Sequence, residues 1–558
     1  MKWMLRAAPL TGRDPQLSTG LWHRMSRLRS PGPCDGSGRR RSLRACLLQQ
    51  LLEVDAMPGP LTTLQSRPFS PLWAALICFG LCSCGRPSMS VDAGVETRDL
   101  CEPDHGGCEQ LCSTVEEKVV CGCEPGGILQ GDGQHCQGWS LPQCTDTHDF
   151  VARDLRVAYT ASGGAMVLHA APTRLTPWTN PALLPSRFLV RATSFDSGTG
   201  WGEQQDLSEL NIERNFECLA LSRVNTRGEV LALMGLGRQP VVARKLLGAD
   251  WSAPSTIATA EGTPFASPEC VATLDDSGNG FAVQPSDDIY GARLAGDSWS
   301  AAEILEPTSA VSNVKLVARA NGNTLMVWHQ RSRLAWKRFV PETGWTTATY
   351  LSAEAELAGP PALAMNERGD AVMVWPTARE AAAVTLQLMA ATFTERDGWT
   401  EPRFIADLGY FRANFGVAAA INSKSEALIT WSQRLKTDDT RTFSAARFSP
   451  DQGWSEPLTL SDSISARADS PTVALDEQGN VVVAWTQTEA QVTTAWASRY
   501  LQGVGWIGPG RIGRILDEHS TMSEAHIGID ARGRVTAIWA TSDLNGVDTS
   551  RLCVSHWE

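Results

Sequence analysis

Lysine, histidine and the short motifs of common enzymes are all scarce in this chain. It has 49 lysine and arginine residues, of which only seven are lysine, and only nine histidines. It contains no His-Glu-x-x-His pair, no Gly-x-Ser-x-Gly turn and no glycine-rich phosphate loop, which excludes the usual signatures of zinc peptidases, serine hydrolases and nucleotide-binding enzymes. We therefore expect no cofactor, no metal ion and no catalytic residue, and the composition favours a binding protein over an enzyme.

Long apolar segments are also missing after residue 83, so that part of the chain has no candidate transmembrane helix. A short export signal precedes it and begins at Met57. Arg67 supplies a positive region, and an apolar stretch too short to span a bilayer follows from Pro71 to Leu81. Residues 57–83 are therefore predicted to be a signal peptide.

The signal ends in Leu81-Cys82-Ser83-Cys84, which resembles a bacterial lipobox, the motif whose final cysteine is diacylated. The resemblance implies lipid chains on Cys84 and a tether over residues 84–99. Such chains would attach an exported protein to the outer membrane or cell surface by a lipid anchor alone, without a membrane-spanning segment. The alternative is a plain secretory signal whose cysteines are incidental.

Residues 1–56 differ from the rest in charge, with ten lysines or arginines against four acids and no sustained apolar period. The excess of arginine over lysine is typical of a GC-rich genome, in which start codons are easily assigned too early. We interpret this segment as disordered, translated upstream sequence, and a basic arm for nucleic acid is the alternative. Residues 84–558 carry 38 basic and 57 acidic residues, a net charge of 19 negative, which disfavours nucleic acid as a partner.

A small cysteine-rich segment follows the tether. Its six cysteines fall within 36 residues, at Cys101, Cys108, Cys112, Cys121, Cys123 and Cys136. So short a segment of an exported chain cannot bury enough apolar surface to fold alone, so this density predicts a disulfide scaffold. The spacing by itself leaves fifteen pairings open.

The segment over residues 100–137 resembles the epidermal-growth-factor-like (EGF-like) module. The likeness rests on the run from His105 to Cys112, on Cys121-Gly122-Cys123 and on the glycine-rich stretch before the last cysteine. It implies first-to-third, second-to-fourth and fifth-to-sixth bridges, namely Cys101 with Cys112, Cys108 with Cys121, and Cys123 with Cys136. Calcium is not expected, because Thr97 to Leu100 offers one carboxylate where calcium-binding members carry an acidic motif. A stiff spacer and a recognition element are both open as roles.

The remainder carries a register that occurs eight times: a turn residue, usually glycine, and a large side chain six positions later. The turn residues are Gly163, Gly228, Gly278, Gly322, Gly369, Ser425, Gly479 and Gly533. The sixth residues are His169, Met234, Gln284, Trp328, Trp375, Trp431, Trp485 and Trp539. Successive turns are 44 to 65 residues apart, a period typical of propeller blades.

One unit illustrates the blade. Ser470 to Leu475 and Val481 to Trp485 are β-rich runs on either side of a polar turn, which predicts a hairpin in which Gly479 takes a positive φ. A third run over Thr494 to Tyr500 leads to Trp506 and a fourth strand. Four short antiparallel strands in about fifty residues form one blade of a propeller.

The fourth strand of each blade, at its outer edge, indicates how the blades would close into a ring. Seven such strands follow the hairpins, marked by Trp201, Trp251, Trp299, Trp345, Trp399, Trp454 and Trp506. An eighth copy, Gly138 to Pro142, lies directly after the cysteine-rich segment. We predict an all-β, eight-bladed propeller over residues 138–558, closed by an N-terminal strand at 138–144, with seven blades as the alternative. Two further disulfides follow from this arrangement, Cys144 with Cys553 across the closure and Cys218 with Cys270 between adjacent blades.

Candidate ligand sites are few. The repeated tryptophans are interpreted as packing between blades, because their register is strict, and the Asp or Asn three residues before several turns as turn chemistry. The register breaks in the first three blades, and the first also carries an insertion, Ala170 to Arg187. The breaks and the insertion make His169, Arg174, Trp178 and Gln284 ligand-binding candidates. Simple drift of repeats is the alternative.

Two groups of acids deserve inspection. Glycoside hydrolysis needs a carboxylate pair, which different blades could assemble together, and Asp275, Asp276, Asp287 and Asp288 form the local cluster of acids that is a candidate for it. Glu518, His519, Glu524 and His526 approach metal-ligand spacing, but they are interpreted as a solvated linker.

The favoured hypothesis is an exported, lipid-anchored, monomeric surface protein without enzymatic activity. Its cysteine-rich stalk would present the propeller to a protein or glycan partner at the cell envelope. The first alternative is a polysaccharide-cleaving enzyme, a glycoside hydrolase or lyase, which needs two carboxylates or an arginine cluster near the centre of the propeller. The second is a purely structural envelope component.

Overall fold

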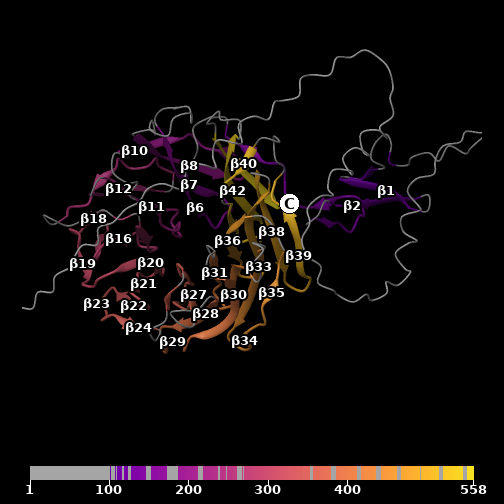
Figure 1. The fold of residues 1–558 in the computed structure, drawn as a ribbon. Helices are drawn as coiled ribbons and strands as arrows, with labels where there is room; N and C mark the ends of the chain where they lie inside the picture. Colours follow the sequence, from indigo (N-terminus) through magenta and orange to yellow (C-terminus); the bar gives the residue numbers. More distant parts are fainter. Residues whose placement is uncertain are drawn as a thin grey trace, which may run out of the picture. The chain divides into compact units, whose positions relative to one another are not determined.

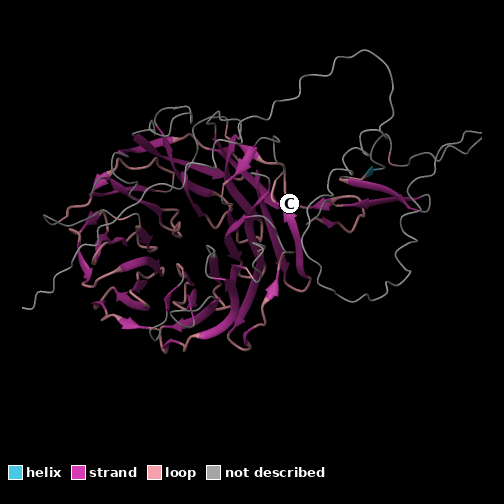
Figure 2. Cartoon of the chain, viewed as in Figure 1, coloured by secondary structure: helices cyan, strands magenta, loops and turns pink. Residues whose placement is uncertain are grey.

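The computed structural model describes residues 101–557 with internal gaps (Figures 1 and 2). The gaps are 102–106, 109, 116–117, 124–126, 146–152, 173–186, 212–217, 237–238, 247, 260–266, 268, 352–355, 358, 379–384, 411–415, 435–440, 462–466, 490–491, 514–519, 524 and 544–549. The predicted signal peptide, the lipidation site and the tether lie outside the described residues, and so do Arg174, Trp178, Glu518, His519 and Glu524. Within the described part, no helix has the length and apolarity needed to cross a membrane.

The cysteine-rich segment is held by disulfides rather than by a core. β1 (Leu111–Val115) pairs with β2 (Lys118–Gly122), and β3 (Ile128–Leu129) pairs with β4 (Cys136–Gln137). Of its described residues only Cys108 is buried. The three disulfides have the predicted pairing, Cys101 with Cys112, Cys108 with Cys121, and Cys123 with Cys136.

Eight antiparallel sheets follow, and each is one blade. Blade one contains β6 (Arg153–Tyr159), β7 (Ala165–Pro172), β8 (Arg187–Asp196), β9 (Gly200–Trp201) and β10 (Gln205–Asn211). Blade two contains β11 (Cys218–Leu221), β12 (Val230–Leu236), β13 (Gln239–Lys245) and β14 (Ser255–Thr256). Blade three contains β15 (Val271–Leu274), β16 (Gly280–Pro285), β17 (Ile289–Ala295), β18 (Ser298–Trp299) and β19 (Glu303–Glu306). Blade four contains β20 (Val311–Ala318), β21 (Thr324–Gln330), β22 (Arg333–Val340), β23 (Gly344–Trp345) and β24 (Thr349–Tyr350).

The second half of the ring repeats the pattern. Blade five contains β25 (Glu356–Leu357), β26 (Ala362–Met365), β27 (Ala371–Ala378), β28 (Thr385–Thr394), β29 (Gly398–Trp399) and β30 (Arg403–Tyr410). Blade six contains β31 (Val417–Ile421), β32 (Ala427–Gln433), β33 (Thr442–Ser449), β34 (Gly453–Trp454) and β35 (Leu458–Thr459). Blade seven contains β36 (Arg467–Leu475), β37 (Val481–Glu489), β38 (Val492–Leu501) and β39 (Gly505–Arg511). Blade eight contains β40 (Ser520–Met522), β41 (His526–Ile529), β42 (Val535–Asp543), β43 (Ser550–Trp557) and the N-terminal strand β5 (Gln143–Cys144).

The blades stand in sequence order around a ring, as Figure 1 shows from the indigo strand β6 to the yellow strands β40 and β42. The first strand of each blade contacts the first strand of the next, and β41 of blade eight contacts β6 of blade one. The predicted eight-bladed propeller is therefore confirmed.

The ring closes where the sequence predicted. Strand β5 pairs with β43, with Cys144 opposite Cys553, and these two cysteines form a disulfide. Further hydrogen bonds join the same segments, since Ser140 N donates to the His556 carbonyl over 2.7 Å. Cys218 and Cys270 form the other predicted bond, between blades two and three.

The repeated tryptophans form the seams between blades. They are at most 1% exposed at Trp328, Trp375, Trp431, Trp485 and Trp539. Each belongs to a core cluster that includes second- or third-strand residues of the preceding blade, as Trp328 does with Phe281 and Val283. Burying an indole at each seam removes a large apolar area from water, so the packing interpretation is confirmed.

Turn chemistry also agrees with the register. All eight turn residues have a positive φ, including Ser425 at 64°. Ser425 is a non-glycine residue in a region that disfavours side chains, and its hydroxyl donates to the Asp370 carboxylate of the neighbouring blade. The hairpins therefore bend where the glycine pattern predicted.

Candidate functional site

The first strand of each blade borders a solvent-exposed centre, which we call the axial channel. Every residue of β26 and β31 is half-buried, whereas every residue of the second strands β27 and β32 is buried. Arg156 is exposed although it lies within β6. Solvent therefore reaches the inner edge of the blades at this level.

One level of the axial channel is set by the register seven residues before each turn. The residues there are Arg156, Val271, Lys315, Ala362, Ala418, Thr472 and His526, and in blade two an extra residue before the turn places Ala220 at this level. Side chains at this level reach the inner edge of the next blade. Arg156 Nε donates to the Leu219 carbonyl of β11 over 3.1 Å, and Thr472 Oγ1 donates over 3.1 Å to the carbonyl of Ala525, the residue before β41. Small or apolar side chains occupy most of these positions, and two cations stand out.

Around these cations lies a group of polar side chains that we call the axial cluster. It comprises Arg156, Tyr159, Glu269, Asn313, Lys315, His329 and His526. Arg156 and Tyr159 lie on blade one beside His526 of blade eight, and the Tyr159 hydroxyl donates to the His526 carbonyl over 2.7 Å.

The other half of the axial cluster lies on blades three and four. The Glu269 carboxylate accepts the Asn313 N–H over 2.6 Å. Asn313 Nδ2 lies 3.3 Å from His329 Nδ1, and an amide nitrogen can only donate, so Nδ1 is the acceptor and Nε2 carries the proton. His329 is 5% exposed, and its Nε2 has no hydrogen-bond partner among the described residues.

Burial controls protonation in the axial cluster. It lowers the pKa of His329 to about 4, with a contribution from the Lys315 charge, and the pKa of His526 to about 4, with a contribution from Arg156. Both imidazoles are therefore neutral at pH 7. Burial also lowers the pKa of Lys315, an effect that the Glu269 charge opposes and the Arg156 charge adds to. Burial raises the pKa of Tyr159 well above its usual range, so its hydroxyl stays protonated.

The two halves of the axial cluster interact across the ring. Arg156 and Lys315 stand on blades one and four, three places apart in a ring of eight, yet the charge of one acts on the other. Neither forms an ion pair with any residue that the structure describes. Among the described residues, Glu269 is the carboxylate whose charge acts on Lys315, so two cations at one level leave this part of the axial channel with an excess of positive charge, although the chain as a whole is acidic.

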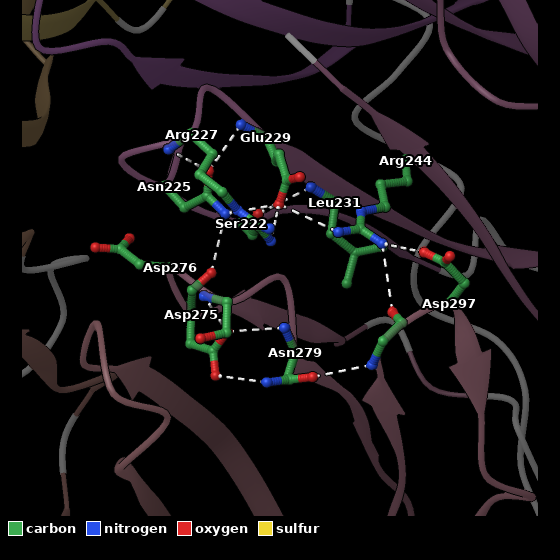
Figure 3. Close-up of polar contacts among 12 residues, drawn as sticks. Ser222, Asn225, Arg227, Glu229, Leu231, Arg244, Asp275, Asp276, Asn279 and Asp297 are labelled. Atoms are coloured by element: carbon green, nitrogen blue, oxygen red, sulfur yellow. Dashed lines mark hydrogen bonds and ion pairs between the residues drawn. The ribbon is translucent and has the colours of Figure 1, made fainter.

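The turn ends of the blades are built differently, from paired polar groups (Figure 3). Asn225 Nδ2 donates to the Asp275 carbonyl of the next blade over 2.9 Å, and its Oδ1 accepts the N–H groups of its own turn. Glu229 accepts from Arg227 and Arg244. Asn366 and Asn422 repeat the bond to the next blade, so the turn asparagines connect the blades as well as shaping the turns.

The blade-three acids do not form a catalytic pair. Asp275 is buried and accepts from the N–H groups of Ser277 and Asn279, which is turn chemistry. Asp287 and Asp288 lie beyond the other end of β16, and its six residues place the two groups about 20 Å apart. That distance is too large for a glycoside-hydrolase pair.

A surface groove of about 850 Å³ lies between the turn ends of blades five and six. Its size suits a small ligand, and its walls carry charges of both signs, some of which form ion pairs. Arg396 pairs with Asp397 over 3.1 Å, and Glu395, whose pKa is lowered in spite of its burial, pairs with Arg319 over 2.8 Å. The lining of this groove has three basic and five acidic side chains, so it is acidic, whereas the axial cluster has an excess of positive charge.

Of the predicted ligand residues, His169 and Gln284 are described, and both take the buried position that tryptophan occupies in other blades. They are 3% and 2% exposed, and Gln284 Nε2 donates to the Ser267 carbonyl over 3.0 Å. The sequence predicts a solvated linker around His526, but His526 begins β41 and belongs to the axial cluster. Counting seven residues back from each turn would have placed Arg156, Lys315 and His526 at one level.

No protein-family model matches the chain. Similar solved structures include the polysaccharide lyase Uly1, with a TM-score of 0.42 and 10% identity over 64% of this chain and 93% of that chain. A mutant of the NanB sialidase from Streptococcus pneumoniae gives a TM-score of 0.35 and 10% identity over 75% of this chain and 70% of that chain. AofleA from Arthrobotrys oligospora gives 0.31 and 15% over 54% of this chain and 87% of that chain. The propeller thus has structural neighbours among polysaccharide lyases and sialidases, but similarity this low carries no inference about the activity of this chain.

Proposed function

We propose that the propeller binds an anionic glycan in its axial channel, with Arg156 and Lys315 holding the acidic group. One observation carries the proposal: these two cations stand at the same level on blades one and four, and neither has a carboxylate in ion-pair contact among the described residues. Lys315 is half-buried and lies within range of the charge of the exposed Arg156, so an anion at this place would pair favourably with both cations.

The rest of the axial cluster suits a sugar. A neutral imidazole offers one donor and one acceptor, and His329 and His526 are both neutral at pH 7 because burial lowers their pKa to about 4. The Nε2 atoms of both imidazoles are buried and have no hydrogen-bond partner among the described residues, so a sugar hydroxyl would pair with them only after a side-chain movement. The acidic surface of the chain would repel a polyanion outside the channel, so affinity must come from the axial cluster itself.

The setting that we propose is the cell envelope. The predicted signal at 57–83 and lipid on Cys84 would export and anchor the chain, and the EGF-like module at 100–137 would act as a spacer. Five disulfides support this placement, because such bonds persist in oxidising compartments.

Calorimetry with a glucuronate-containing oligosaccharide tests the binding. Arg156→Ala and Lys315→Ala should each weaken binding about tenfold or more, since each removes one charge-assisted contact. Arg396→Ala is the matched control, because Arg396 is an exposed arginine on an outer turn, paired with Asp397. Equal affinity of all four proteins, or binding to neutral oligosaccharides alone, would refute the proposal.

Cleavage of the same glycan by β-elimination is the second candidate, and the neutral imidazoles beside cations favour it. His526 would take the proton from C5 of a uronate while Arg156 or Lys315 neutralises its carboxylate. His329 is not the base, because its Nε2 carries a proton and its Nδ1 already accepts from Asn313. The bond from C4 to the glycosidic oxygen would break, that oxygen would gain a proton, and a double bond between C4 and C5 would remain. Incubating the polymer with the protein and following the ultraviolet absorbance of the unsaturated product separates cleavage from binding, and a flat trace with intact binding would exclude this candidate.

A further inference from the structure

An ion pair crosses the ring at the turn end of the axial channel. Arg223, at the turn of blade two, pairs with the carboxylate of Glu367, at the turn of blade five. These blades are three places apart in a ring of eight, so side chains that meet between them must span the centre of the ring.

Neighbouring turns hold this pair in place. Arg223 Nη2 also lies 3.8 Å from the Asp276 carboxylate of blade three. On the other side, the second carboxylate oxygen of Glu367 accepts the Ala320 N–H over 3.2 Å, and Arg319 Nε of blade four donates to the Glu367 carbonyl over 2.8 Å. The crossing is therefore supported by four consecutive blades.

The Arg223–Glu367 pair lies nearer the turn end of the axial channel than the axial cluster does. Arg156 and Lys315 stand seven residues before their turns, Arg223 five and Glu367 two. At about 3.3 Å per strand residue, Arg223 begins roughly 7 Å nearer the turn end than the two cations. Towards the other end, β20 begins at Val311, four residues or about 13 Å of strand before Lys315.

We infer that the axial channel is blocked at the turn end and that the axial cluster binds the acidic end group of a glycan chain. The inference rests on the proposed function and narrows its ligand. A polymer cannot thread past the Arg223–Glu367 pair, and an internal sugar would reach the cations only if the chain entered and left through the same opening. A sugar at the end of a glycan can place its carboxylate against Arg156 and Lys315 while the rest of the glycan leaves through the opening away from the turn end.

Two isomeric oligosaccharides distinguish the cases. One carries a single glucuronate at its non-reducing end, and the other carries it internally, between neutral sugars. We expect the terminal isomer to bind at least tenfold more tightly. Equal or tighter binding of the internal isomer would overturn the inference while leaving the proposed function intact, whereas absence of binding by both would remove the proposed function and the inference with it.

Variants at the crossing test its role. Arg223→Ala should improve binding of the internal isomer and narrow the difference between the two, because it opens the turn end. Arg227→Ala is the matched control, since Arg227 lies on the same turn and pairs with Glu229 of its own blade over 2.8 Å. An unchanged ratio in Arg223→Ala would show that the pair does not exclude the internal isomer. A peptide with a free C-terminal carboxylate that binds more tightly than the terminal isomer would also contradict the inference.

Discussion

The indole of Trp485 on blade seven stacks on the ring of Phe443 on blade six, with centroids 5.0 Å apart and planes inclined by 23°. Both side chains are at most 1% exposed. This contact is one instance of the seam that each repeated tryptophan forms. A substitution at Trp485 therefore measures how much one seam contributes to the stability of the ring.

Trp485→Ala should lower the free energy of unfolding by about 3 to 5 kcal/mol, because it removes a buried indole and leaves a cavity between two blades. Denaturant titration measures the change. Trp506→Ala is the comparison: Trp506 packs edge-on against Tyr500 and is half-buried, so its loss should cost clearly less. Equal costs would contradict the assignment of Trp485 to a seam.

Removing the Cys144–Cys553 disulfide should destabilise the propeller more than removing Cys218–Cys270. The two bonds close loops of 409 and 52 residues, and the chain-entropy model assigns them on the order of 5 kcal/mol or more and about 4 kcal/mol. Double serine variants, each replacing both cysteines of one bond, give the comparison by thermal or chemical unfolding. The opposite order would mean that strain or residual structure outweighs loop entropy.

Stability should fall as the pH drops from about 6.5 to 4, in part through His329. Burial and the Lys315 charge lower its pKa to about 4 in the fold, and an unfolded histidine titrates near 6.5, so within this window the unfolded chain binds more protons. The loss from this group is on the order of 3 kcal/mol, and it is complete below pH 4. His329→Gln should flatten the slope in urea titrations across this range, with the His526 contribution remaining. A slope identical to that of the unsubstituted protein would contradict the shift.

Intact mass of the mature protein should begin at Cys84 and include the mass of the lipid chains and of five disulfides. Expression in a bacterium that processes lipoproteins, followed by mass spectrometry, measures all three features together. Cys84→Ala is the control and should yield an unlipidated product. A mature protein that retains Met57, or one that starts elsewhere with Cys84 unmodified, would contradict the export prediction.

The sequence predicted the fold because its determinants are local and repeated. The turn glycines, the tryptophans six residues later and the copy of the outer strand at Gly138 to Pro142 each depend on neighbours a few residues away. A pattern that would be weak evidence in a single copy occurs eight times, which makes the prediction of blades strong. The closing disulfide then followed from strand order alone.

The axial cluster was not predicted, because its members come from blades far apart in the chain. Most blades carry a small or apolar side chain at the level of Arg156 and Lys315. Each of these two cations occurs in one blade only, and no neighbouring sequence feature indicates that the two are related. Their proximity depends on the closed ring. The Arg223–Glu367 crossing depends further on the width of that ring, which no local pattern encodes.

The breaks in the tryptophan register were a poorer guide. Gln284 fills the same buried position as tryptophan and satisfies its amide on the Ser267 carbonyl, so this change of residue type alters packing without exposing a new surface. Periodicity identifies positions that differ, but only the three-dimensional arrangement shows whether a position faces solvent or a neighbouring blade.

Strand β5 has a consequence for biosynthesis. It is the first propeller strand to leave the ribosome, and its partner β43 is the last. Until synthesis is nearly complete, Cys144 therefore has neither its partner strand nor its disulfide partner, Cys553. The cysteines of the preceding module, 11 to 13 residues from their partners, can pair long before. A chain truncated before Cys553 would thus display an unmatched thiol, a chemical mark by which an oxidising compartment can tell an unfinished ring from a finished one.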